Sequence, residues 1–202
     1  MLQKIILFLF VIGNAYSQTS AIKIEDETKN NRLSIYALNK TETDYDVKIN
    51  ITGKNIRQST RKPRFVRVPA ASKVLLKSLI IERGKQPSYT YELEVNDSLS
   101  HRSLKPPSES IKIDPPKQIV VYVTENCMTC DSILSRLANS KYIFTTINLV
   151  DKPDVKERMM TYLGDEVSSL ESLTNPILNI GGLLYTKIEN YEMLLESLNK
   201  PD

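Results

Sequence analysis

The only two cysteines of the chain, Cys127 and Cys130, lie two residues apart in the stretch VTENCMTCDSILSRL, residues 123–137. A continuous apolar run precedes them and apolar residues at helical spacing follow, which places the pair at a strand-to-helix junction. A thiol attacks only as its thiolate, and the free N–H groups at the start of a helix favour negative charge there. Cys130 lies one turn further along and can close a disulfide. The spacing therefore fits a two-thiol exchange cycle, with Cys127 as the nucleophile and Cys130 as the resolving thiol.

Two other uses of this cysteine pair remain open on the sequence alone. A structural disulfide is one, although closing a two-residue loop removes little chain entropy. A metal site is the other, and it would need ligands from two chains because the only histidine, His101, lies far from the pair in the sequence. The cysteine pattern favours redox chemistry over both alternatives.

The N-terminus predicts the compartment in which these thiols would act. Residues 1–17 hold one lysine, a short apolar run and an Ala-x-Ser motif, the pattern of a cleaved secretory signal. No other apolar run is long enough to cross a membrane. We therefore expect a secreted protein, most simply periplasmic, in an oxidising compartment.

Charge and composition divide the 202-residue chain into two units. Residues 18–115 carry 18 Lys/Arg and 12 Asp/Glu, a net +6, whereas residues 116–202 carry 8 and 12, a net −4. The net charge of the whole chain, +3, is too small to predict a nucleic-acid partner. Short alternating segments predict an all-β sandwich over residues 20–98, and a Ser/Pro-rich linker follows over 99–116. As a class, this first unit resembles the immunoglobulin-like modules of secreted bacterial proteins.

The second unit, residues 117–200, alternates strand and helix patterns in the order β-α-β-α-β-β-α. With the Cys-Met-Thr-Cys motif, the Thr174-Asn175-Pro176 triplet before a strand and Gly181-Gly182 after it, this unit resembles a thioredoxin-fold domain, and within that superfamily a glutaredoxin. The resemblance implies an α/β fold with a mixed four-stranded sheet and helices on both faces. It also implies that Pro176 is a cis-proline beside the cysteines, and that the backbone of Thr174 and Asn175 docks the substrate chain.

The residues around the motif depart from the glutaredoxin pattern. Glutaredoxins commonly have a lysine before the first cysteine, a proline-aromatic inner pair and a late Gly-Gly-acidic segment that grips glutathione. The corresponding residues here are Thr124-Glu125-Asn126, Met128-Thr129 and the segment 185–190. We therefore predict no bound cofactor, and use of glutathione as a co-substrate is doubtful. Glu125 and Asp131 add negative charge on either side, which should raise the pKa of the Cys127 thiol and argues against a strong oxidant.

These observations predict an extracytoplasmic thiol–disulfide oxidoreductase that acts on exported proteins or peptides and needs a redox recycling partner. The sandwich would present the substrate or tether the enzyme. A competing hypothesis is a non-catalytic binding or structural module with a thioredoxin-like scaffold.

Overall fold

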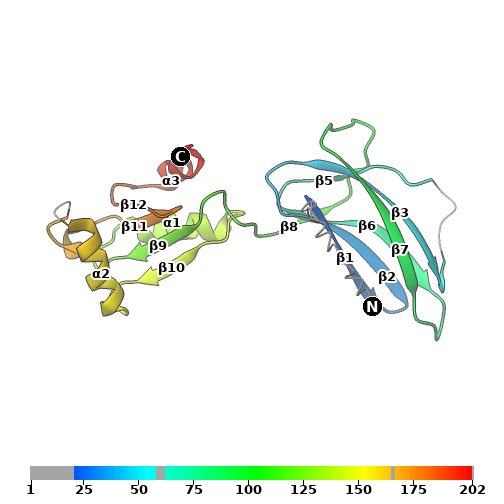
Figure 1. Ribbon diagram of the computed structural model, residues 1–202, viewed down its shortest axis with the longest axis horizontal. Coiled ribbons are helices and arrows are strands. Elements are labelled where there is room, and N and C mark those ends of the chain that lie inside the picture. Colours follow the sequence, from blue (N-terminus) through cyan, green and yellow to red (C-terminus); the bar gives the residue numbers. More distant parts are fainter. Residues whose placement is uncertain (1–20, 58–61, 165–166, 202) are drawn as a thin grey trace, which may run out of the picture.

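The computed structural model describes residues 21–57, 62–164 and 167–201, and Figure 1 shows two units joined by one stretch of chain. The predicted signal segment, residues 1–17, lies outside the described residues. Within the described residues, no helix is long and apolar enough to span a bilayer.

The first unit is an antiparallel β-sandwich, as the alternating patterns predicted. One sheet has the strand order β1-β2-β6-β4, with β8 also paired to β6, and the other has the order β5-β3-β7. Inward-facing residues of both sheets, among them Ile35, Ile49 and Leu79, form the core between them. The strands are β1 (Ile22–Lys29), β2 (Arg32–Asn39), β3 (Tyr45–Lys54), β4 (Ile56–Arg57), β5 (Val66–Val68), β6 (Ser72–Ile81), β7 (Ser88–Asn96) and β8 (Ser108–Ser110).

The turn between β1 and β2 shows how local sequence sets the strand register. Asn30 and Asn31 both have positive φ angles, 49° and 59°, which a two-residue hairpin requires at its centre and which asparagine tolerates. Lys29 then pairs with Arg32, and the pairing continues to Ile22 and Asn39.

A buried carboxylate fixes one end of the sandwich. The side chain of Asp46 is only 1% exposed; Arg67 Nε donates to its Oδ1 at 2.5 Å and the Ser100 N–H donates to its Oδ2 at 2.6 Å. Burial raises the pKa of Asp46, but the hydrogen bonds from Arg67 and Ser100 outweigh burial, so the net pKa is lowered. The charged form is therefore the one that stabilises the fold.

Replacing Asp46 with asparagine should make the stability of the sandwich less sensitive to acid. Because the folded-state pKa lies below the unfolded value of about 3.9, the carboxylate stabilises the fold above that pH. This contribution is lost as the pH falls through the lower folded-state pKa. We expect Asp46→Asn to cost about 2 kcal/mol near pH 7, measured by urea denaturation, and the difference from wild type to shrink below about pH 4. A difference that stays constant from pH 7 to pH 2.5 would contradict this assignment.

The Ser/Pro-rich segment predicted as a linker is hydrogen-bonded to both units. Its residues 108–110 form β8, which pairs with β6. The N–H of Ile111 then donates to Ala71 O at 2.9 Å, and the N–H of Ile113 donates to Lys141 O at 2.8 Å. The segment predicted as a linker thus contains the short strand β8, and beyond it Ile113 forms only an isolated bridge with Tyr142.

A polar contact also joins the two units beside this crossing. Tyr142 Oη donates to Glu42 Oε1 at 2.5 Å, and Lys141 Nζ lies 3.1 Å from the same carboxylate oxygen. Burial, followed by the contact with Glu42, raises the pKa of Tyr142. Ala71 of the sandwich also belongs to the hydrophobic cluster of the second unit.

The second unit has a thioredoxin-like α/β fold, as the sequence predicted. Its mixed sheet has the order β10-β9-β11-β12, in which β10 runs parallel to β9 while β11 and β12 are antiparallel to their neighbours. The elements are β9 (Ile119–Val123), α1 (Cys130–Asn139), β10 (Thr145–Asn148), α2 (Pro153–Leu163), a 3-10 helix η2 (Leu170–Ser172), β11 (Ile177–Ile180), β12 (Leu183–Tyr185) and α3 (Tyr191–Asn199).

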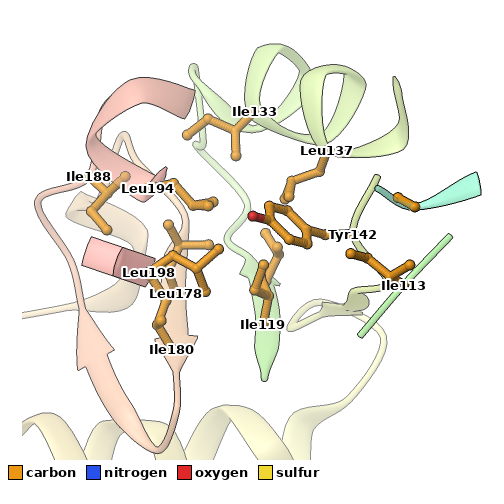
Figure 2. Close-up of a cluster of buried hydrophobic side chains, with 12 residues drawn as sticks. Ile113, Ile119, Ile133, Leu137, Tyr142, Leu178, Ile180, Ile188, Leu194 and Leu198 are labelled. Atoms are coloured by element: carbon orange, nitrogen blue, oxygen red, sulfur yellow. The ribbon is translucent and has the colours of Figure 1, made fainter. Parts of the chain in front are cut away.

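Helices cover both faces of this sheet, with α1 and α3 on one side and α2 on the other (Figure 1). Figure 2 shows the first layer, in which Ile133 and Leu137 of α1 and Leu194 of α3 meet Ile119 of β9 and Leu178 of β11. On the other face, Met159 and Leu163 of α2 pack with Ile177. Because β9 has apolar contacts on both faces, it reads in the sequence as a continuous apolar run. Its C-terminal end and the start of α1 hold the cysteine pair.

Candidate redox site

Cys127 and Cys130 form a disulfide at the start of α1, with their Cα atoms 5.6 Å apart. Cys130 is the first residue of the helix and is only 3% exposed, whereas Cys127 precedes the helix and is half-buried. The two sulfurs therefore differ in access. A partner thiol or disulfide from solution therefore has readier access to Cys127 than to Cys130. The roles of the two cysteines in exchange stay a prediction.

The loop that carries Cys127 is held against the segment that precedes β11. Thr124, the first residue after β9, is buried, and its hydroxyl donates to Leu173 O at 3.3 Å. Asn126 Nδ2 donates to Glu171 O at 2.8 Å, and the N–H of Cys127 donates back to Thr124 O at 3.4 Å. These bonds fix the loop on the side facing η2.

The inner pair of the motif is anchored to the same segment. The N–H groups of Met128 and Thr129 both donate to Thr174 O, at 2.8 and 3.4 Å. The Thr129 hydroxyl donates to Asn175 Oδ1 at 3.2 Å. Thr174 and Asn175 therefore lie against the cysteine motif, where their contacts are with the inner pair Met128-Thr129, and the Thr174 carbonyl already accepts two of these hydrogen bonds. Substrate docking by these residues stays a prediction.

The cis conformation predicted for Pro176 is wrong for this structure. No peptide bond among the described residues is cis, and these include the Asn175–Pro176 bond. Pro176 is buried directly before β11. An X–Pro bond favours the trans form by about 0.5–1 kcal/mol unless its surroundings select cis. The cis expectation came from the family resemblance alone, and the trans bond in the structure follows the intrinsic preference.

Four charged side chains belong to the motif loop and to the elements near it, α1, α2 and η2. Glu125 and Asp131 flank the cysteines and are exposed, and Lys156 of α2 forms an ion pair with Glu171 of η2. The hydrogen bond from Lys156 lowers the pKa of Glu171 to about 2. Lys156 also lies close enough to Glu125 for the two opposite charges to attract. Met128, between the cysteines, is 82% exposed and offers an apolar contact at the centre of this polar surface.

Sequence reasoning missed the contribution of η2 and Lys156 to the site. The acidic stretch that contains η2 has no clear periodicity, and Lys156 lies on a helix 26 residues beyond Cys130. Only the sheet topology brings them to the loop. The Thr174-Asn175-Pro176 triplet was the one signal in the sequence that pointed to this neighbourhood.

Comparison with known proteins assigns no family to this chain. No protein-family model and no curated protein matches it. Among solved structures, a β-D-mannosidase from Dictyoglomus thermophilum matches at 16% identity and a TM-score of 0.26, over 50% of this chain and 13% of the mannosidase chain. A likeness this low supports no conclusion about fold or activity, so the chemistry must be argued from the site itself.

The second alternative for Cys127 and Cys130 was a metal site, and in the structure the two residues form a disulfide. Within the described residues, no group of three or more His, Cys, Asp and Glu side chains gathers in a metal-binding arrangement. In the disulfide state neither sulfur is a thiolate, the form that binds metal ions. The Cys127–Cys130 disulfide is consistent with a redox site.

Proposed function

We propose that the protein is an extracytoplasmic thiol–disulfide oxidoreductase with a glutaredoxin-like catalytic unit. The observation that carries the proposal is the Cys127–Cys130 disulfide at the first turn of α1, with one sulfur accessible and the other buried. A disulfide that served only to stabilise the fold would contribute little here, because closing so short a loop removes little entropy from the unfolded chain. A pair in which only one sulfur is readily attacked suits ordered exchange.

The reaction proceeds in two exchange steps. In the reduced protein, the Cys127 thiolate attacks one sulfur of a substrate disulfide, and the other substrate sulfur leaves as a thiolate that takes up a proton. Cys130, after losing its proton, then attacks Cys127 Sγ, which breaks the mixed disulfide and releases the second substrate thiol. Two electrons pass from the protein to the substrate, and the Cys127–Cys130 disulfide remains. A dithiol partner reverses the same steps to regenerate the protein; run backwards, the cycle oxidises a substrate dithiol.

Exported proteins or peptides are the proposed substrates. This proposal rests on the signal-like segment 1–17 and on the lack of counterparts to the glutathione-gripping residues. The exposed Met128 and the acidic residues Glu125 and Asp131 form a surface that suits a polypeptide better than an anionic tripeptide. The sandwich would hold the catalytic unit near its substrates.

A turnover assay tests this function directly. We expect catalytic amounts of the full chain to accelerate reduction of a peptide disulfide by excess dithiothreitol, compared with dithiothreitol alone. Cys127→Ser should reduce the rate to that of dithiothreitol. The matched control Ser132→Ala, which changes an exposed residue of the same helix turn, should retain the wild-type rate. If the wild type gives no acceleration with any of several peptide disulfides, the non-catalytic binding module is the better account.

A further inference from the structure

Helix α1 begins with a residue that normally caps a helix but does not cap this one. Threonine is among the preferred N-cap residues because its oxygen accepts a hydrogen bond from a first-turn N–H. Thr129 is the N-cap of α1, yet it has helical backbone angles, φ −96° and ψ −7°, and its side chain makes no capping bond. By contrast, the N-cap of α3, Asn190, is extended and accepts from Met193 N at 3.0 Å.

The Thr129 hydroxyl is directed elsewhere. It donates to Asn175 Oδ1 at 3.2 Å, while the Met128 and Thr129 N–H groups donate to Thr174 O. Two consecutive residues before β11 therefore hold both the backbone and the side chain of the inner pair. Of these three hydrogen bonds, only the one to Asn175 Oδ1 has a side-chain acceptor; the other two are accepted by the backbone carbonyl of Thr174.

The uncapped first turn matters because the cysteine sulfurs lie at it. The first four N–H groups of a helix have no partner within the helix. The first helical bond here runs from Ile133 N to Thr129 O, so the N–H groups of Cys130, Asp131 and Ser132 precede it. A thiolate at this position is stabilised by those donors and by the helix dipole. A hydroxyl that capped the turn would compete with the sulfur for them.

We propose that Asn175 is a positioning residue that holds the Thr129 hydroxyl away from the first turn of α1, leaving the N–H groups of that turn to the Cys127 sulfur when the disulfide is open. This inference deepens the proposed oxidoreductase function and rests on it. It gives the Asn175 side chain a role in tuning the nucleophile, separate from the predicted use of its backbone in docking a substrate.

The charged groups around the motif do not change in the variants that test this proposal. Glu125 of the loop, Asp131 of α1 and the Lys156–Glu171 pair of α2 and η2 are present in all of them. Their effect on the Cys127 thiolate is therefore common to every variant. Differences in the pKa of Cys127 between the variants then reflect the backbone N–H donors at the start of α1.

The experiment measures the pKa of Cys127 in the reduced full chain from the pH dependence of its alkylation by iodoacetamide. Asn175→Ala frees the Thr129 hydroxyl, and a change of the Thr129 backbone from helical to extended angles then lets it cap the turn, which should raise the pKa by roughly 0.5–1 unit. Thr129→Val removes the competing hydroxyl and should stay near wild type, as should Thr129→Ser, which keeps it. The double variant Asn175→Ala/Thr129→Val should behave as Thr129→Val.

Two results would overturn the proposal. One is an Asn175→Ala pKa that is unchanged or lowered, and the other is a double variant that keeps the shift of Asn175→Ala. If Asn175→Ala does not fold, Asn175→Leu removes the acceptor at similar side-chain volume and gives the same reading. Because no substrate is present, the outcome is separate from the proposed function: a wild type that shows the pKa pattern without turnover would retain the positioning role and reject the enzyme.

Discussion

Replacing Cys130 with serine is expected to trap the protein in covalent complexes with its disulfide substrates. Cys127 still attacks and forms a mixed disulfide, but no second thiol resolves it, since these are the only cysteines of the chain. Multiple turnover should fall to background. Mass spectrometry of the reduced variant after mixing with a peptide disulfide should show one peptide thiol attached at Cys127.

The reverse substitution is the matched control for this trapping. Cys127→Ser leaves the buried Cys130, 3% exposed, as the only thiol, and it should form little or no mixed disulfide on the same timescale. Each variant keeps one of the two sulfurs, Cys127 in one and Cys130 in the other, so the comparison isolates access. Equal trapping by both variants would show that the exposure of the two sulfurs does not set the order of attack, and trapping by neither would count against exchange chemistry.

Truncating Ile133 to alanine should be among the most damaging single changes to the fold of the second unit. Ile133 is fully buried, one turn after Cys130, and packs in the layer that Figure 2 shows between α1 and the sheet. Loss of three carbons leaves a cavity that the sheet behind it cannot easily fill. We expect a loss of about 3 kcal/mol in the free energy of unfolding, measured by urea denaturation followed by circular dichroism.

An exposed isoleucine provides the control for this truncation. Ile143 is 49% exposed, and its backbone N–H bond to Ile113 O does not depend on its side chain. Ile143→Ala should therefore cost under about 1 kcal/mol. Similar losses in the two variants would mean that the layer around Ile133 is not the core of this unit.

Local patterns were sufficient to predict most of the elements. The alternation in residues 45–51 and 89–95 predicted β3 and β7, because a half-buried strand shows its two faces in the sequence. For α2, the proline at its start and Gly164 just after its last residue mark both boundaries in the local sequence. The position of the cysteine pair at the start of α1 followed from the same reasoning.

Features that depend on distant contacts could not be predicted in the same way. The strand β8, inside the segment predicted as a linker, is set by pairing with β6, and no local pattern encodes that register. The contact of Tyr142 with Glu42 joins residues 100 positions apart. The Thr129–Asn175 hydrogen bond spans 46 positions and replaces the cap that a local reading of Thr129 favours.

The equilibrium reduction potential of the Cys127–Cys130 pair tests most directly whether this disulfide cycles. It is measured by incubating the full chain in graded ratios of reduced and oxidised dithiothreitol and quantifying the free thiols. A cycling pair should have a potential of about −180 to −270 mV, within the range of cellular dithiol exchangers but less oxidising than the strongest oxidants near −120 mV. A potential below about −300 mV, where structural disulfides of secreted proteins lie, would contradict the account.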